Sequence, residues 1–297
     1  MFHFLQQARH WRMKRELNRL HIELAGRFDY LRRASRCRTQ NEFNRLHIEL
    51  ENILTPLELA GIAKLAKTST SPEPSRLWLE RIQKWKPELF ESPQGYERRS
   101  FSRHVTLYQN PNGDAHDKGL LVAFSGDARR LMMPISVFLQ FVDSRKWDVV
   151  VLKRGSRNSY LLGLDSIVTD FHGLVEYLQT TFTPAQYRRV MTLGTSSGGF
   201  AAAWAAFLMG ADRGISVGGG PPRPLPALTT GDQPAPDGVD LCYVYGMDCP
   251  QDHQAALLLL DIFGGRLRPV PDIDAHGVLS RLLKSGKLAE FLDEMLA

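Results

Sequence analysis

Residues 190–204 constrain the fold of this chain more than any other stretch. An apolar run that favours β-structure, 190–193, leads into the residues GTSSG at 194–198, and an alanine-rich segment of helical character follows. A strand, a Gly-x-Ser-x-Gly turn and a helix in this order are the signature of a nucleophile elbow. The motif predicts a strand-to-helix turn that lifts one serine hydroxyl out of the fold.

The serine at the centre of this turn is Ser196. It has a glycine two positions before it and another two positions after it, whereas Ser197 does not fit this frame. Glycine is needed on both sides because larger side chains would collide in so tight a turn. The next backbone N–H, that of Ser197 at the start of the predicted helix, would point to where an oxyanion forms.

A nucleophilic serine needs a base, and in this kind of fold the order along the chain is serine, acid, histidine. His253 and His276 are the histidines that follow Ser196. His276 falls between a predicted strand, 267–271, and the last predicted helix, which is where the base belongs. His253 is interpreted as a solvated residue in the first turn of a helix. We therefore predict that His276 is the base.

The acid that orients this base is expected after the preceding strand, 239–245. Asp248 lies immediately beyond the strand end. Asp252 opens the next helix, where it could cap the helix N-terminus or reach the histidine Nδ1. The residue pattern alone leaves both aspartates open as the acid.

A second oxyanion donor is expected from the loop after the predicted strand 120–125. Gly126 and Asp127 follow that strand, so the backbone N–H of one of them should act together with Ser197. Asp127 precedes Ser196 in the chain, which favours a turn residue over a catalytic acid.

Basic residues follow strands that should end at the same edge of the sheet. They are Arg129, Arg130 and the loop 153–157. These side chains could bind an anionic group of a substrate, although a solvated basic loop is the more ordinary interpretation.

Strands and helices alternate from about residue 100 onward. The predicted strands are 103–108, 120–125, 147–152, 190–194, 214–218, 239–245 and 267–271. The predicted helices are 131–143, 165–181, 199–209, 252–263 and 278–296. Such alternation predicts an α/β fold, a mostly parallel doubly wound sheet with helices on both faces. The proline-rich stretch 221–238 is too short for a lid domain, so the site should be open or covered by the N-terminal helices.

The N-terminal third is predicted to be all helical. The heptapeptide NRLHIEL occurs at 18–24 and again at 44–50, with apolar residues at helical spacing around both copies. Two copies indicate a duplicated helix that could pack as a hairpin. We predict a helical segment at 1–67, a linker with a short helix at 68–95, and an α/β domain at 96–297.

Charge is unevenly divided between these parts. Residues 1–99 carry 19 Lys and Arg against 12 Asp and Glu, net +7, and the remainder carries 18 against 20, net −2. A basic surface could touch nucleic acid or an anionic membrane. No nucleic-acid-binding module is recognisable, so a solvated basic face is predicted and no nucleic-acid partner is expected. The helices could instead form an oligomer, bind a protein partner or cover the sheet.

Composition bounds the class of protein. Apolar residues make up 43 % of the chain, yet no run is long enough to predict a transmembrane helix. The N-terminus lacks the pattern of a secretory signal. The cysteines, Cys37, Cys242 and Cys249, form no disulfide framework, which is typical of a reducing cytoplasm. The histidines show no metal-ligand spacing, so neither a metal nor a cofactor is expected.

Taken together, the motif at 194–198, the strand–helix alternation and the ordered acid and histidine loops resemble the α/β-hydrolase superfamily over about residues 100–297. The segments 245–252 and 276–288 are similar to a compact bacterial subgroup without a large lid, often found near surface-polysaccharide genes. In that subgroup the acid stands four residues before an alanine, which implies Asp252, four before Ala256.

This resemblance implies chemistry through an acyl-serine without a cofactor. The reaction would be hydrolysis of an ester, thioester or amide, or transfer of the acyl group to an acceptor, with a small molecule or a glycan as the acyl-bearing substrate. Fold membership does not define the substrate. A hypothesis of another class is a helical interaction protein that carries a catalytically idle hydrolase fold.

Overall fold

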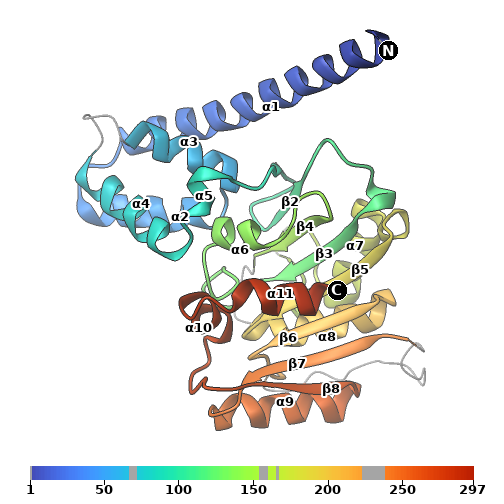
Figure 1. Cartoon of the computed structure of the whole chain (residues 1–297). Helices are drawn as coiled ribbons and strands as arrows, with labels where there is room; N and C mark the ends of the chain where they lie inside the picture. The colour runs from blue at the N-terminus through green and yellow to red at the C-terminus, as the bar shows by residue number, and fades with distance from the viewer. Residues whose placement is uncertain (1, 67–71, 154–159, 165–166, 223–237) are drawn as a thin grey trace. The chain divides into compact units, whose positions relative to one another are not determined.

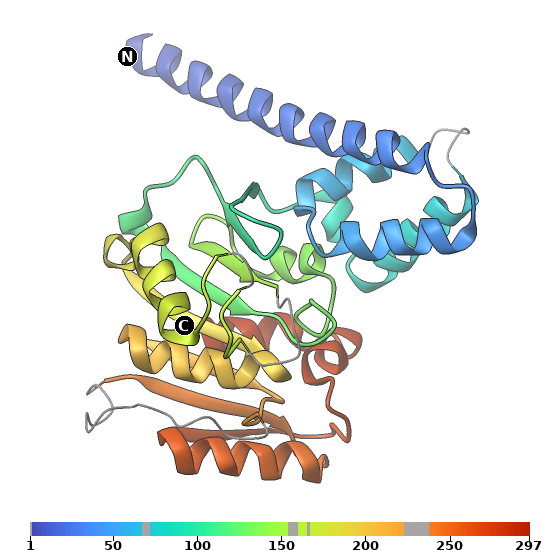
Figure 2. The same cartoon turned by 180° about the vertical axis from the view of Figure 1, so that it is seen from behind.

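We describe the chain from a computed structural model of residues 1–297 (Figures 1 and 2). The described residues are 2–66, 72–153, 160–164, 167–222 and 238–297. They form two compact units, which are taken separately below. The first comprises Met1–Arg98, Gln109–Asn112 and Pro134–Arg145, and the second comprises Arg99–Tyr108, Gly113–Met133 and Lys146–Ala297.

The first unit is helical. Its helices are α1 (Phe2–Ala34), α2 (Gln40–Glu51), α3 (Pro56–Ala66), α4 (Glu73–Trp85), α5 (Glu88–Glu91) and α6 (Ile135–Phe141). Helices α1 and α3 pack closely through glycines: a Cβ at Gly26 would lie 2.7 Å from the Glu58 Cβ, and one at Gly61 would lie 2.6 Å from the Glu23 carbonyl oxygen. The predicted segment 68–95, a linker with a short helix, lies partly outside the described residues, and its described part contains α4 and α5.

An aromatic stack fills the space between α2 and α4. The ring of His47 lies parallel to that of Trp78, with centroids 4.3 Å apart, and Tyr30 of α1 stacks beside both. Beneath the stack, Glu51 accepts a hydrogen bond from Trp78 Nε1 (2.8 Å) and pairs with Arg81. The space between α2 and α4 is therefore filled by aromatic rings above the paired carboxylate of Glu51.

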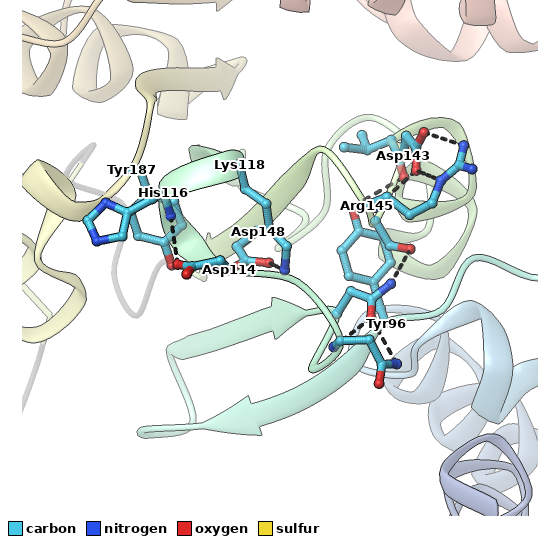
Figure 3. Close-up of polar contacts among 12 residues, drawn as sticks. Tyr96, Asp114, His116, Lys118, Asp143, Arg145, Asp148 and Tyr187 are labelled. Atoms are coloured by element: carbon cyan, nitrogen blue, oxygen red, sulfur yellow. Dashed lines mark hydrogen bonds and ion pairs between the residues drawn. The ribbon is translucent and has the colours of Figure 1, made fainter. Parts of the chain in front are cut away.

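Helix α6 is anchored to these helices. The Ser136 hydroxyl donates to the carbonyl oxygen of Glu51 (3.3 Å). Just beyond α6, Tyr96 donates to the Val142 carbonyl oxygen (3.2 Å), and Arg145 pairs with Asp143 (Figure 3). A helix that the sequence analysis placed in the α/β domain thus belongs to the helical unit.

The second unit is built on an eight-stranded sheet with the order β1-β2-β4-β3-β5-β6-β7-β8. The strands are β1 (Glu97–Ser100), β2 (Val105–Gln109), β3 (Gly119–Phe124), β4 (Trp147–Leu152), β5 (Arg189–Thr195), β6 (Arg213–Val217), β7 (Asp240–Gly246) and β8 (Arg266–Val270). The pairs from β4 through β8 are parallel, and β2 is antiparallel to β4. Seven strands match predicted ones within a few residues, and β1 had not been predicted.

Helices cover both faces of this sheet, as predicted. Figures 1 and 2 show α7 (Phe171–Phe182), α8 (Ser197–Met209) and α9 (Pro250–Phe263) on one face and α11 (Leu288–Leu296) on the other. Strands β3 and β4 are buried along their whole length, which is typical of central parallel strands. The second unit is therefore a mostly parallel, doubly wound α/β layer structure.

Three predicted helices have other bounds in the structure. The helix predicted at 131–143 is shortened to α6, whose N-cap is Pro134. The predicted helix 278–296 is divided into α10 (Val278–Lys284) and α11, because Gly286 adopts a left-handed φ of 75°. Helix α7 begins at Phe171, because the Asp170 carboxylate caps it by accepting from the Gly173 N–H (2.7 Å).

A buried ion pair fixes the opposite end of the sheet from the strand–helix turn at Ser196. Lys118, just before β3, donates through Nζ to the Asp148 carboxylate at 2.9 Å, and the Tyr187 hydroxyl donates to the second carboxylate oxygen (Figure 3). Burial, together with the charge of Asp148, raises the pKa of the Tyr187 hydroxyl. The cluster lies at the amino ends of β3 and β4, so we assign it a structural role.

Candidate active site

Ser196 stands between β5 and α8 in a strained backbone conformation, with φ 54° and ψ −127°. A Cβ at Gly194 would overlap the carbonyl oxygen of Gly198, and a Cβ at Gly198 would overlap that of Phe124. The Ser196 N–H donates to the Val217 carbonyl oxygen of β6 at 2.9 Å. The turn therefore has the geometry that the Gly-x-Ser-x-Gly motif predicts. It needs glycine at both 194 and 198.

His276 reaches this serine from the loop between β8 and α10. Its Nε2 lies 2.8 Å from the Ser196 Oγ. Its Nδ1 lies 2.8 Å and 3.1 Å from the two carboxylate oxygens of Asp252. With the proton on Nδ1, the ring donates to Asp252, and Nε2 accepts from the Ser196 hydroxyl.

The two candidate aspartates occupy different environments. Asp252 lies in the first turn of α9, whose N-cap is Cys249, and its side chain is buried against His276. Asp248 is exposed, and its backbone N–H donates to the Ile273 carbonyl oxygen. The structure therefore brings Asp252 to the histidine and leaves Asp248 in a backbone contact. His253 lies exposed on α9, with its ring stacked on Tyr245.

The electrostatic environment favours the protonated form of His276. The hydrogen bond that the ring donates to Asp252 is the largest cause that raises the pKa of the imidazole. Burial opposes it, and the charges of Asp252 and Asp127 raise the pKa further. The His276 side chain is 52 % exposed, so its Nε2 side can be reached from solvent.

The loop after β3 packs against Ser196. A Cβ at Gly126 would lie 3.0 Å from the Ser196 Cβ, so the backbone runs directly against the turn. The Gly126 N–H donates to the Arg130 carbonyl oxygen (3.2 Å). The Asp127 carboxylate accepts a hydrogen bond from the Ser197 hydroxyl, which ties this loop to the first residue of α8.

A glycine run after β6 is the part of the site that sequence reasoning missed. Gly218 has φ 58°, and a Cβ there would lie 3.1 Å from the Asp252 Oδ2 and 3.2 Å from the His276 Cε1. Three consecutive glycines at 218–220 were the available signal, but only the fold shows that Gly218 stands beside Asp252 and His276.

Among the described residues, the basic side chains predicted near the site do not form a cluster. Arg129 is exposed with φ 56° on the loop after β3, and Arg130 is half-buried. Most of the loop 153–157 lies outside the described residues.

Within the described ranges, no group of three His, Cys, Asp or Glu side chains could hold a metal ion. Across the same residues, no helix combines the length and apolar character that a membrane crossing requires.

The sheet order, the strand–turn–helix at Ser196 and the chain order of serine, aspartate and histidine together define the α/β-hydrolase fold. The second unit has this fold, as the sequence analysis expected.

Neither a family model nor a curated protein matches the chain. Among solved structures, the chain is similar to esterase 2 of Thermogutta terrifontis, at 15 % identity and a TM-score of 0.45 over 68 % of this chain and 94 % of that one. It is similar to an alpha-beta serine hydrolase homologue from Coxiella burnetii, at 15 % identity and a TM-score of 0.44 over 68 % and 97 %. A Pyrobaculum calidifontis esterase is similar at 12 % identity and a TM-score of 0.45 over 72 % and 89 %.

Proposed function

We propose that this protein is a serine hydrolase that cleaves an acyl ester, thioester or amide through an acyl-serine. The observation that carries the proposal is the continuous hydrogen-bonded series from Asp252 through His276 to Ser196. A serine held on a strained turn against an imidazole, itself held by a buried carboxylate, is the arrangement that activates a hydroxyl for attack.

The first half of the proposed reaction forms the acyl-enzyme. The Ser196 Oγ attacks the acyl carbon while its proton passes to the His276 Nε2. The tetrahedral intermediate then collapses, and the bond to the leaving group breaks as His276 returns the proton to it. Asp252 keeps the imidazole in the required tautomer and stabilises its charged form.

The second half releases the acyl group. A water molecule gives a proton to His276 and attacks the acyl carbon, and the Ser196 Oγ leaves with that proton. In both halves the N–H of Ser197 is proposed to receive the oxyanion. The second donor is better assigned to the Asp127 N–H than to that of Gly126, because the latter already donates to Arg130.

Acyl transfer is the second candidate function, and the exposure of His276 favours it. An imidazole that is half open to solvent can take a proton from an acceptor alcohol as well as from water. A panel of short acyl esters, assayed with and without sugar acceptors, separates the two. Hydrolysis predicts equal amounts of alcohol and free acid, and transfer predicts an acylated acceptor at the expense of the acid.

A fluorophosphonate probe tests the proposed nucleophile. We expect the wild-type protein to be labelled and Ser196→Ala to lose labelling and ester turnover while its circular dichroism is unchanged. Ser197→Ala is the matched control and should keep much of both, because the substitution preserves the backbone N–H. An unlabelled wild-type protein would instead support the catalytically idle fold, and loss of labelling in Ser197→Ala alone would show that the serine frame is wrong.

A further inference from the structure

Helix α1 carries an apolar stripe on the side that faces away from α3. Its six large residues are each more than half exposed: Met13, Leu17, Leu20, Leu24, Phe28 and Leu31. Their spacing of three and four residues places them on one face of the helix, about 100° wide and ~27 Å long. A helix that is apolar on two opposite sides needs a partner on each.

The two copies of the heptapeptide NRLHIEL, in α1 and α2, bury different faces of their helices. The heptapeptide NRLHIEL buries its two leucines and its histidine in α2, where Leu46, His47 and Leu50 enter the core and Ile48 is exposed. In α1 the same heptapeptide buries the opposite side, Ile22 and Glu23, against α3. The leucine face that is packed in α2 is thus left uncovered in α1.

We propose that the stripe on α1 pairs with the same stripe of a second copy of this chain, with the two helices antiparallel. The stripe is self-complementary about its midpoint near residue 22. In an antiparallel pair Met13 faces Leu31 of the other copy, Leu17 faces Phe28, and Leu20 faces Leu24. Each contact then occurs twice, as a twofold dimer interface requires.

Charges along the stripe favour this arrangement. Glu16 and Arg27 lie on the same edge of the stripe, about three turns apart. Reversal of one helix brings the two copies of this edge together, with Glu16 of each copy near Arg27 of the other. The Arg27 Nε also donates to the Gly61 carbonyl oxygen at 2.8 Å, which holds its side chain beside the stripe. Residues 13–31 carry Lys14, Arg15, Arg19 and Arg27 against Glu16, Glu23 and Asp29, net +1. Over the whole of α1 the count is eight Lys and Arg against three Asp and Glu, net +5. An anionic membrane surface is therefore the competing occupant, and the vesicle experiment below tests it.

The area of the stripe is near the smallest that specific protein interfaces bury. Six large side chains of this exposure offer on the order of 1,000 Å² of apolar surface for a pair, close to the lower bound of specific protein interfaces. Residues that flank the stripe would add to this area.

The oligomeric state of the full chain is the first test. Sedimentation velocity over a range of concentrations should give a dimer for the wild type and a monomer, half the mass, for Leu20→Glu/Leu24→Glu. The matched control is Leu77→Glu, an equally exposed apolar position on α4, which should remain dimeric. A wild-type protein that stays monomeric at all concentrations, or a double variant that stays dimeric with unchanged circular dichroism, would overturn the proposal.

Disulfide trapping in a Cys37→Ser background tests the direction of the pair. Leu20→Cys mixed with Leu24→Cys should give a cross-linked heterodimer, and Met13→Cys should cross-link with Leu31→Cys but not with itself. Efficient self-linking of Met13→Cys would show a parallel pair and refute the geometry. Cosedimentation of a monomer with phosphatidylserine vesicles, lost in Leu20→Glu/Leu24→Glu, would refute the second copy as the occupant.

Discussion

At the scale of single residues, the site depends on a backbone conformation that has a cost. A non-glycine residue with the φ and ψ of Ser196 costs on the order of 1–3 kcal/mol, and the surrounding contacts must hold it there. Gly194 and Gly198 supply those contacts, because each allows a carbonyl oxygen to approach where a Cβ would stand.

The first prediction concerns this close approach. Gly194→Ala should destabilise the protein by about 2 kcal/mol or more and abolish fluorophosphonate labelling, since the new Cβ must displace the turn. Gly210→Ala is the control: its φ is 61° but no atom lies within 4 Å of the new Cβ, so it should cost about 1 kcal/mol and keep labelling. Urea unfolding and probe labelling measure both, and equal labelling in the two variants would contradict the account.

The second prediction separates the two aspartates. Asp252→Asn should lower kcat by about 10⁴-fold, because an amide opposite Nδ1 favours the wrong imidazole tautomer. Asp248→Asn should change kcat little, since its side chain is exposed away from His276. Turnover of a chromogenic ester measures both, and a larger loss in Asp248→Asn would reverse the assignment of the acid.

The third prediction concerns Asp127 and pH. Its negative charge is among the causes that raise the pKa of His276, and the proposed reaction needs His276 neutral. Asp127→Asn should therefore move the acidic limb of kcat/KM to lower pH, while asparagine can still accept from Ser197. An unchanged limb, or one displaced to higher pH, would exclude this role for Asp127.

At the scale of elements, the stack between α2 and α4 makes the helical unit sensitive to acid. Burial, and secondarily the charge of Arg81, lowers the pKa of His47 from 6.5 to about 4. As the pH falls, His47 is therefore protonated at a lower pH in the folded state than in the unfolded state. The contribution of His47 to the free energy of unfolding is present in full above pH 6.5. It is lost as the pH falls toward 4, by about 3 kcal/mol in all.

The fourth prediction follows from this dependence. His47→Phe keeps a ring beside Trp78 but cannot take a proton, so the free energy of unfolding should fall less between pH 7 and 5 than in the wild type. His21→Phe, the equivalent position of the other repeat copy, is exposed and should leave the pH dependence as it is. Chemical denaturation at several pH values measures this difference. Equal changes in the free energy of unfolding with pH for wild type and His47→Phe would contradict the prediction.

At the scale of the whole molecule, the two units are interleaved along the chain. Helix α6 comes after β3 in sequence, yet it contacts α2 and α3 and belongs to the helical unit. Removal of the N-terminal helices would therefore take away the partners of a helix that remains in the chain.

The fifth prediction tests this interleaving. Deletion of residues 1–67 should lower the soluble yield and the Tm, because the face of α6 that meets α2 and α3 becomes exposed. The soluble fraction should still react with the fluorophosphonate probe, since Ser196, His276 and Asp252 all lie in the other unit. A soluble truncated protein of unchanged Tm would show that α6 needs no partner, and a soluble protein without probe reactivity would show that the helices complete the site.

Local sequence rules determined the outline of the second unit. Strand and helix periods, with glycines at 194 and 198, predict the sheet, its helices and the turn at Ser196, because these depend on neighbouring residues. The order of serine, acid and histidine likewise directs attention to His276. The strands, the helices and the turn could be predicted because each depends on a short stretch of chain, and the order of the three residues is read directly along it.

Only the tertiary structure decided the features that depend on distant residues. Asp248 precedes α9 and Asp252 lies in its first turn, and the packing of α9 determines which one meets His276. Gly218 joins them only through the folding of β6 beside β7. The heptapeptide NRLHIEL gives the clearest case: its two copies have the same residues but bury opposite faces, because burial depends on which helix packs against each copy.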